Sequence, residues 1–417
     1  MKMLIHWIWF STRPGLSDRG RAAVLQHFHD AEDIYYADPE AIACVEGISA
    51  EACESLAEKD LKAAEEILSQ CAKKDIHILT YQDAAYPARL KAISDPPVVL
   101  YYKGTLPELD ALPVIAVVGT RKASAYGMTT AKRMGYQIAA CGGVVLSGAA
   151  DGIDSMAMRG ALSAGGTVVA VLGCGADVVY PRGNRSLYAD TQANGCLLTE
   201  FPPGTEPYAW NFPKRNRLMS GLSCGVLVVE APEKSGALIT VRQAAEQGRD
   251  VFVVPGNIDV DTCKGSNALM RDGGIPISSG WDVLSEYEAL FPGKIQDRCK
   301  PGRQVAYPDE VAKAQEETER NLPKVAQKPA VLAKTKANKK KEIDNGQVRP
   351  YIDAEEKLPA LSQREEALVA LLREGVTLVD DLIARSGEPA GAVLADLTML
   401  EVKGIVTRLP GKRVAIK

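Results

Sequence analysis

The feature that most constrains the fold is a regular alternation, between residues 114 and 254, of short apolar runs with segments of helical periodicity. Runs that are apolar throughout are typical of strands buried on both faces, and the intervening helices allow such strands to run parallel. The pattern predicts an α/β fold with a doubly wound, Rossmann-like parallel sheet. Two further strands are predicted at 76–79 and 95–101, so this extended Rossmann-like domain covers residues 76–290. The apolar runs lie at residues 114–118, 143–147, 167–172, 196–199, 225–229 and 251–254.

The first 75 residues have a different pattern, that of several short helices. We predict helices at 19–29, 38–44, 50–57 and 61–73, which together form a helical domain of the SAM or helix-hairpin-helix type. The turn at residues 45–49 contains Gly47, and Ser49 is placed to cap the next helix. Glu46, Glu51 and Glu54 surround the turn with negative charge, which disfavours a DNA phosphate and favours a plain packing role.

The end of the chain predicts a linker and a small domain. Residues 291–358 include the segment 321–341, which has seven lysines, two prolines and no acidic residue, and we expect a flexible linker there. Residues 359–417 predict a winged-helix domain, with helices at 362–373, 378–385 and 390–402 and a hairpin formed by 405–409 and 413–416. Its third helix carries Asp396 and Glu401, so we do not expect this helix to read the major groove.

Composition excludes several classes of site. The net charge is −4, so any nucleic-acid site has to be local. All four histidines lie before residue 78, which excludes a Ser–His–Asp triad or a histidine-ligated metal in the main domain. The nine cysteines include no Cys-x-x-Cys pair, which indicates reduced thiols rather than disulfides or zinc. The apolar residues 1–10 are too few to span a bilayer and lack a signal-peptide pattern, so we expect a cytoplasmic protein without a membrane segment.

Three glycine-rich turns, at residues 119–121, 147–154 and 173–175, each follow a predicted strand and precede a helix. In a doubly wound sheet such turns meet at the carboxyl ends of the strands, where ligands bind. Glycine allows the backbone to approach an oxyanion, and the following helix offers free N–H groups. Tight strand–helix packing alone also selects glycine, but three such turns in succession favour a phosphate-binding crevice. Neither a P-loop nor a Gly-x-Gly-x-x-Gly pattern is present, which disfavours a dinucleotide.

A basic segment at residues 212–223 opens a predicted helix with three cations and an amide, Lys214, Arg215, Asn216 and Arg217. Cations at a helix N-terminus oppose the macrodipole, so local stability does not explain them and an anionic ligand would. Further cations, Arg121, Lys122 and Arg182, lie far from this segment in the sequence. The separation favours a ligand with several phosphates, such as a nucleic-acid strand. Phe212 offers a face on which a base can stack, although a core role is equally consistent with composition.

The motifs in residues 76–290 resemble those of the DNA-processing protein A family (DprA, also called Smf). The resemblance implies a bacterial protein that binds single-stranded DNA without sequence preference, protects incoming strands during natural transformation and loads a RecA-type recombinase. It also implies a homodimer formed through the Rossmann domain, and no catalytic activity, cofactor or metal. The motifs are Val118-Gly119-Thr120-Arg121, Ser147-Gly148-Ala149-Ala150-Asp151-Gly152-Ile153-Asp154, Ala170-Val171-Leu172-Gly173-Cys174-Gly175-Ala176-Asp177 with Tyr180-Pro181, Phe212-Pro213-Lys214-Arg215-Asn216-Arg217, Val228-Val229-Glu230-Ala231 with Ser235-Gly236-Ala237-Leu238-Ile239-Thr240, and Val253-Val254-Pro255-Gly256.

The same resemblance implies the residues of the binding site. The side chains implied to bind the strand are Arg121, Arg182, Lys214, Arg215, Asn216 and Arg217, with Phe212 as a possible base platform. The residues implied to supply backbone donors are Gly119, Ser147, Gly148, Gly152, Gly173 and Gly175. One departure is Thr199-Glu200, where the family often has Ser-Glu, and both hydroxyls fit.

The alternative is a nucleotide-binding enzyme or sensor. Related Rossmann-like domains cleave nucleoside phosphates and resemble one another in a Pro-Gly-Gly-x-Gly-Thr-x-x-Glu signature. Residues 230–240 contain only Ser235-Gly236 of that signature, and the expected glutamate does not follow Thr240. A general base and its partner are therefore missing, which disfavours hydrolysis. A sensor for a small phosphate ligand stays open, because the crevice could hold one.

Overall fold

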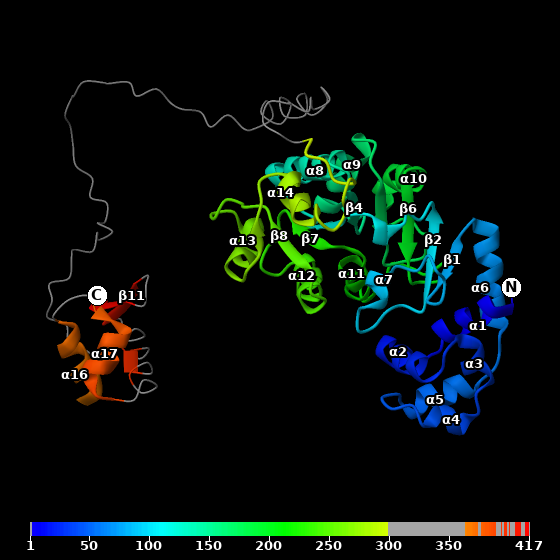
Figure 1. Ribbon diagram of the computed structural model, residues 1–417, viewed down its shortest axis with the longest axis horizontal. Coiled ribbons are helices and arrows are strands. Elements are labelled where there is room, and N and C mark those ends of the chain that lie inside the picture. Colours follow the sequence, from blue (N-terminus) through cyan, green and yellow to red (C-terminus); the bar gives the residue numbers. More distant parts are fainter. Residues whose placement is uncertain are drawn as a thin grey trace, which may run out of the picture. The chain divides into compact units, whose positions relative to one another are not determined.

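The computed structural model describes residues 2–298 and, in the C-terminal part, residues 363–373, 377–388, 393, 396, 397, 400, 405–409 and 413–416. The chain divides into two compact units, Met1–Val325 and Ala326–Lys417 (Figure 1). Within the described ranges, no helix combines the length and the apolar character needed to cross a bilayer.

A nine-stranded sheet with the order β1-β2-β6-β5-β4-β3-β7-β8-β9 forms the centre of the first unit. The strands from β6 to β9 in this order all run parallel, which confirms the predicted doubly wound α/β class. The strand order reverses at β3, which pairs with β4 on one side and with β7 on the other. The parallel strands are β3 (Val114–Val118), β4 (Val144–Ser147), β5 (Val168–Val171), β6 (Gly195–Thr199), β7 (Gly225–Val228), β8 (Asp250–Val253) and β9 (Ile275–Pro276).

The other two strands make the sheet mixed rather than wholly parallel. β1 (His77–Thr80) pairs antiparallel with β2 (Val99–Gly104), and β2 pairs antiparallel with β6. The sequence analysis predicted both strands, but not their direction, because an apolar run does not indicate the direction of its neighbour. They extend the sheet at the edge that faces the N-terminal helices.

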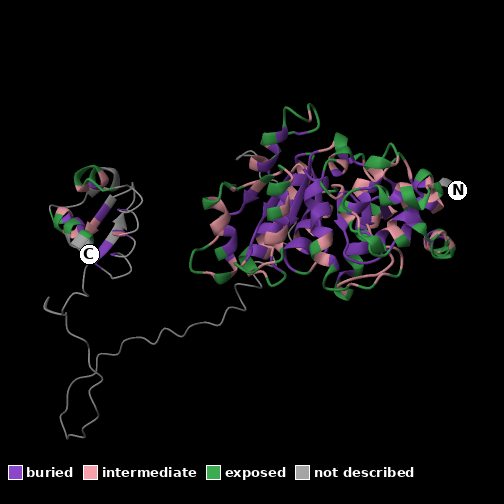
Figure 2. Ribbon diagram, turned by 90° about the horizontal axis from the view of Figure 1, so that it is seen from below, coloured by how far each residue is buried: buried purple, intermediate pink, exposed green. Residues whose placement is uncertain are grey.

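Helices cover both faces of the sheet, as Figure 1 shows. Alternate residues of each strand point to opposite faces, so Ile115 and Val117 join one core while Val114 and Ala116 join the other. Figure 2 shows these buried strands in the interior. The first core contains residues of α8 (Ala125–Ala140), α9 (Ile153–Ser163), α10 (Arg185–Ala193) and α14 (Gly280–Leu284). The second contains residues of α7 (Ala88–Lys91), α11 (Asn211–Leu222), α12 (Ala237–Glu246) and, at its margin, α13 (Lys264–Arg271). Short 3₁₀ turns lie at Leu109–Ala111, Arg182–Asn184, Asp261–Cys263 and Ser285–Tyr287.

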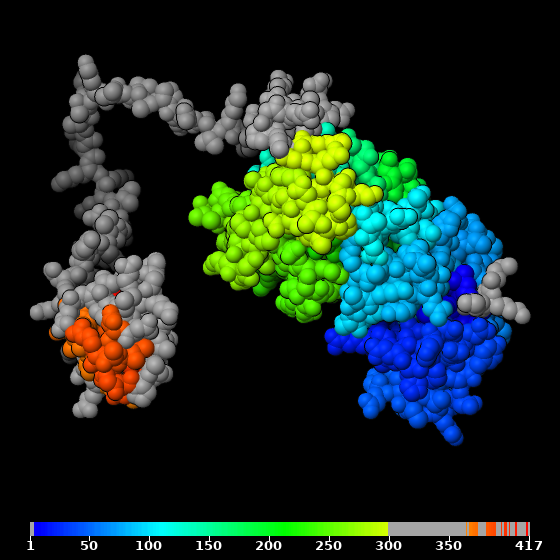
Figure 3. Space-filling view, viewed as in Figure 1, coloured from blue at the N-terminus to red at the C-terminus, as the bar shows by residue number. Residues whose placement is uncertain are grey.

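Six helices precede the sheet and share a core of their own. Tyr101 of β2 belongs to that core, so the helices pack on the edge of the sheet, as the contact between the blue and cyan surfaces in Figure 3 shows. The sequence analysis assigned no helix to α1 or α3. α1 buries Ile8, Trp9 and Phe10 completely, so this short helix lacks the polar face that periodicity detects. The helices are α1 (Lys2–Ser11), α2 (Asp18–His27), α3 (Ala31–Tyr36), α4 (Pro39–Ala43), α5 (Ala50–Ala57) and α6 (Lys62–Lys74).

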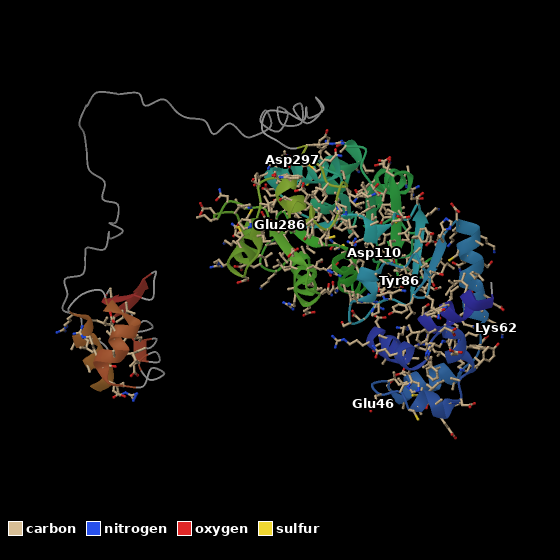
Figure 4. All side chains as sticks on the ribbon, viewed as in Figure 1. Glu46, Lys62, Tyr86, Asp110, Glu286 and Asp297 are labelled. Carbon is tan, nitrogen blue, oxygen red and sulfur yellow. The ribbon has the colours of Figure 1, made fainter. Side chains whose placement is uncertain are left out.

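The glycine turn before α5 has the predicted geometry. Gly47 adopts a φ of 84°, and Ser49 Oγ accepts a hydrogen bond from the N–H of Ala52 at 3.1 Å. The predicted cap is therefore confirmed. Glu46 is exposed beside the turn (Figure 4), which fits the argument that this surface disfavours a phosphate.

The second unit contains α16 (Gln363–Leu372), α17 (Val379–Ser386) and a three-stranded antiparallel sheet. β11 (Val406–Leu409) and β12 (Arg413–Ile416) form the predicted hairpin, and β10 (Thr377–Leu378) adds a strand that the sequence analysis did not predict. Arg364 Nε lies 3.5 Å from Asp396 Oδ2. Most of the third helix predicted at 390–402, and the linker beyond residue 298, lie outside the described residues.

Candidate functional site

A crevice of about 720 Å³ lies at the carboxyl ends of β3 and β7, where the strand order reverses. Doubly wound folds bind ligands at such a point, because the connections leave the sheet in opposite directions there. The turn after β3, the loop after β7 and the first turns of α11 contribute much of the lining, together with residues of the turn after β4, the loop before α11 and the start of α12. The predicted site residues among its lining are Gly119, Arg121, Phe212, Arg215 and Asn216.

The half-buried ring of Phe212 lies among cations in the wall of the crevice. The guanidinium carbon of Arg121 is 5.2 Å from the ring centroid, and that of Arg215 is 6.0 Å away. Tyr180 packs against the same ring, with 5.5 Å between centroids. A side chain at Gly173 would collide with the ring, because its Cβ would lie 2.9 Å from Cδ1 of Phe212. The crevice therefore combines a fixed aromatic surface with positive charge.

Arg215 supplies positive charge from a buried position, since only 4% of the residue is exposed. Its guanidinium donates to the carbonyl oxygen of Val171 and, through Nε, to Oδ1 of Asn216 at 3.2 Å. A Cβ on Gly148 would lie 2.4 Å from both terminal nitrogens, so a side chain there would displace the guanidinium. Burial lowers the pKa of the guanidinium, and the carboxylate of Asp154 opposes that shift.

The glycine turns pack against the protein's own atoms. A Cβ on Gly119 would lie 2.5 Å from Cγ1 of Ile153, and one on Gly152, where φ is 80°, would lie 2.4 Å from the carbonyl oxygen of Thr120. Tight packing thus accounts for these glycines without a ligand. The sequence analysis gave strand–helix packing as the alternative explanation for such turns. Gly119 still lines the crevice, so its prediction as a backbone donor stands.

Ser147 and Gly175 form hydrogen bonds within the protein. The N–H of Gly175 donates to the carbonyl oxygen of Thr205 at 2.9 Å. The buried hydroxyl of Ser147 donates to the carbonyl oxygen of Val117 at 2.6 Å. Neither Ser147 nor Gly175 lines the crevice, so their assignment as backbone donors to a ligand stays a prediction.

The basic segment divides between two faces of α11, and Arg217 lies away from the crevice. Its side chain is 4% exposed and forms ion pairs with Glu200 at 2.5 Å, Asp18 at 3.2 Å and Asp95 at 3.4 Å. Lys214 lies 3.0 Å from Asp18 and 3.8 Å from Glu200. We call these five residues the α2–α11 ion cluster. The guanidinium of Arg217 is therefore surrounded by acidic side chains, and Arg217 does not line the crevice. The side chain of Lys214 is 39% exposed and lies at the solvent edge of this cluster.

Electrostatics support a structural role for the α2–α11 ion cluster. Burial lowers the pKa of the Arg217 guanidinium, but Glu200, Asp18 and Asp95 outweigh burial and hold this pKa above its ordinary value. Burial raises the pKa of the Glu200 carboxyl, and Arg217 and Lys214 oppose that shift. Each charge is therefore tolerated because the others are present.

Arg182 lines a second cavity of about 620 Å³ together with Arg185. Tyr180 and Pro207 line both this cavity and the crevice, so the two hollows adjoin. The sequence analysis did not assign Lys234, which is exposed in the loop after β7 and lines the crevice. Its position shortly after the carboxyl end of a predicted strand was the signal that could have identified it.

Glu230, two residues after β7, is the acidic residue that closes the turn leading into α8. It is fully buried and accepts hydrogen bonds from the N–H of Ser124 at 3.2 Å and from its hydroxyl at 2.8 Å. It therefore anchors the start of α8.

Comparison with known proteins identifies the family. The family model for DNA recombination-mediator protein A matches residues 77–288, and the model for the DprA winged helix domain matches residues 353–412. The protein Smf of Synechocystis is 33% identical over 415 residues, which cover 98% of this chain and 97% of that protein. The chain belongs to the DprA/Smf family. The second family model confirms the C-terminal winged helix, which the sequence analysis predicted from periodicity.

Other DprA/Smf proteins match a part of the chain at higher identity. The DNA processing protein DprA of Bacillus subtilis is 40% identical over 220 residues, which cover 53% of this chain and 74% of that protein. The crystal structure of DprA from Streptococcus pneumoniae superposes with a TM-score of 0.61 at 34% identity, and covers 69% of this chain and 99% of that chain. These similarities agree with the fold described above.

Proposed function

We propose that the protein is a DNA-processing protein that binds single-stranded DNA in the crevice and in the adjoining cavity. The observation that carries the proposal is the ring of Phe212 at the reversal point of the sheet, with the guanidinium carbon of Arg121 5.2 Å and that of Arg215 6.0 Å from its centroid. A phosphate and a base of one strand would find complementary groups there within a few ångströms.

The two adjoining hollows suit a ligand with several phosphates. Arg121, Lys122 and Lys234 line the crevice, and Arg182 and Arg185 line the cavity beside it. A backbone that runs from one hollow to the other would pass Tyr180, which lines both. Contacts to phosphates are blind to sequence, and so is the stacking of a base on an aromatic ring, which predicts binding without sequence preference.

Single strands fit this surface better than duplexes. A half-buried ring such as that of Phe212 stacks only on a base whose face is free, and bases in a duplex are already stacked on each other. Family membership supports the same ligand, because the matching model describes a mediator of DNA recombination. From the same membership we propose that the protein acts in the cytoplasm as a homodimer, protects incoming strands in transformation and loads a RecA-type recombinase.

We propose no catalytic step. Glu230 is buried and satisfied by Ser124, so it is not available as a general base. Asp154 lines the crevice, but burial raises the pKa of its carboxyl, while Arg215 and the N–H groups of Ala150 and Gly148 stabilise its charge. Turnover of nucleoside phosphates by the purified protein would contradict this proposal.

Salt dependence of binding to a fluorescent oligonucleotide tests the proposed site. For single strands the logarithm of affinity falls with the logarithm of salt concentration by about 0.7 for each phosphate contact. Arg121→Ala, which removes an exposed cation, should lower the affinity and reduce the slope by about 0.7. Lys62→Ala, an exposed cation on the N-terminal helices (Figure 4), is the matched control. An unchanged slope for Arg121→Ala, or equal affinity for a mononucleotide and a long strand, would refute the site.

A further inference from the structure

An exposed pair of stacked aromatic rings lies immediately before α11. The rings of Tyr208 and Trp210 are nearly parallel, with 7° between their planes and 4.7 Å between their centroids. Tyr208 is 49% exposed and Trp210 is 70% exposed. The pair therefore adds little to the core, although stacking fixes one face of each ring.

The pair borders the crevice. Pro207 and Ala209, which alternate with the two aromatic residues, line the crevice, and Phe212 follows two residues after Trp210. The same crevice is lined by the cations Arg121, Lys122 and Lys234. An anionic chain held by these cations would have the exposed rings next to its path.

Hydrogen bonds hold the aromatic pair and its loop in place. The N–H of Asn211 donates to the carbonyl oxygen of Tyr208 at 3.0 Å, and its side-chain amide donates to that of Glu206 at 3.3 Å. Farther back, the N–H of Gly204 donates to Oδ1 of Asp177 at 2.8 Å. A surface that is ordered before binding loses little conformational entropy when a ligand arrives.

We propose that the Tyr208–Trp210 pair is a second base-stacking platform, which takes a base of single-stranded DNA outside the crevice. The proposal rests on the proposed function, because the crevice has to hold the neighbouring nucleotides. Every base has a π-face, so such a platform lengthens the binding site without adding sequence preference. The cations beside it favour a nucleic-acid strand over an apolar partner.

Tryptophan fluorescence reports on the platform directly. Of the four tryptophans, Trp7 and Trp9 are buried in the N-terminal core and Trp281 is half-buried, so Trp210 is the exposed one. Titration of the full chain with oligo(dT) of increasing length should quench the emission of Trp210. Trp210→Ala should lower the affinity for long oligonucleotides roughly 5-fold to 150-fold, the effect of removing one aromatic stack, and should leave a dinucleotide unaffected.

Two further variants complete the test. Trp210→Phe keeps a stacking ring and should bind nearly as the parent does, which carries the test if Trp210→Ala folds poorly. Tyr36→Ala removes a ring that is also 70% exposed, but on α3, and should bind as the parent does.

The outcomes separate the platform from the crevice. In one outcome the parent binds, Arg121→Ala weakens binding, and Trp210→Ala keeps both the affinity of the parent and its fluorescence quenching by oligo(dT). This result refutes the platform and leaves the proposed function standing. If the parent does not bind oligonucleotides, the proposed function itself fails. If Trp210→Ala changes only the sedimentation coefficient, the pair is a contact between copies of the chain and the platform is overturned.

Discussion

Replacing Arg217 by alanine should destabilise the protein without removing a DNA contact. The side chain of Glu200 is 6% exposed and that of Asp18 is 17% exposed, and both lose their main partner in this variant. Removing one member of a buried ion pair costs about 3–5 kcal/mol, because the remaining charge stays in a medium of low polarity. Lys214 still lies 3.0 Å from Asp18, so we expect the lower end of this range, about 3 kcal/mol.

Urea unfolding followed by circular dichroism measures this change in the free energy of unfolding. Arg121→Ala is the matched control, since Arg121 is exposed, and its stability should stay within about 0.5 kcal/mol of the parent. Adding Glu200→Gln to Arg217→Ala should recover part of the loss, because a neutral amide then replaces the unpaired carboxylate. Oligonucleotide binding, measured at a temperature where both variants are folded, should fall for Arg121→Ala and remain for Arg217→Ala.

The opposite pattern would refute the reasoning. If Arg217→Ala unfolds at the urea concentration of the parent while its affinity for oligonucleotides falls as far as that of Arg121→Ala, then Arg217 binds the strand. The α2–α11 ion cluster would then contribute nothing to stability, and the division of cations on α11 described above would be wrong.

Three further predictions concern the crevice and its supports. Gly148→Ala places a Cβ 2.4 Å from the terminal nitrogens of Arg215, so it should cost about 1–3 kcal/mol of stability and weaken oligonucleotide binding. Gly183→Ala, whose Cβ would have no atom within 4 Å, is the control and should change neither the thermal melt nor the binding titration. Phe212→Ala should weaken oligonucleotide binding by about 1–3 kcal/mol with an unchanged salt slope, and a change in slope would count against stacking. Burial raises the pKa of the Asp18 carboxyl, but Arg217 and Lys214 outweigh it and the net pKa is lowered. The stability that Asp18 contributes should therefore be present above pH about 4 and be lost as the pH falls through the folded-state pKa. Urea unfolding against pH should show this loss in the parent and not in Asp18→Asn.

Sequence patterns predicted most helices and the parallel strands from β3 to β8, because strands buried on both faces are apolar throughout. The exposed two-residue strand β9 has no such run and was missed. The alternation of residues 114–254 was sufficient for the fold class, and the hairpin of β11 and β12 followed from the same logic. The short helices α1 and α3 were missed because neither has an amphipathic pattern long enough to detect. The direction of β1 and β2 depends on pairing with β6, which is a contact between distant segments that periodicity does not record.

Only part of the candidate site could be predicted, because the sequence pattern does not record contacts between distant segments. Residue type identified Arg121, Phe212 and Arg215, which the structure brings together in the crevice. It could not distinguish them from Arg217, whose partner Asp18 lies 199 residues away in the sequence. A glycine turn can serve either phosphate binding or tight strand–helix packing. The contacts that a Cβ would make at Gly119 and Gly152 show that packing applies at these two positions.

The phase of α11 explains how one short basic segment serves two purposes. Lys214 and Arg217 are three residues apart and share one face of the helix, which meets Asp18 of α2. Arg215 lies on another face and lines the crevice with Phe212. The N-terminal helices are therefore tied by ion pairs to the same helix that positions the aromatic wall of the crevice. Because the two faces carry separate tasks, removing Arg217 should lower the stability of the N-terminal helices while Phe212 and Arg215 keep their places in the crevice.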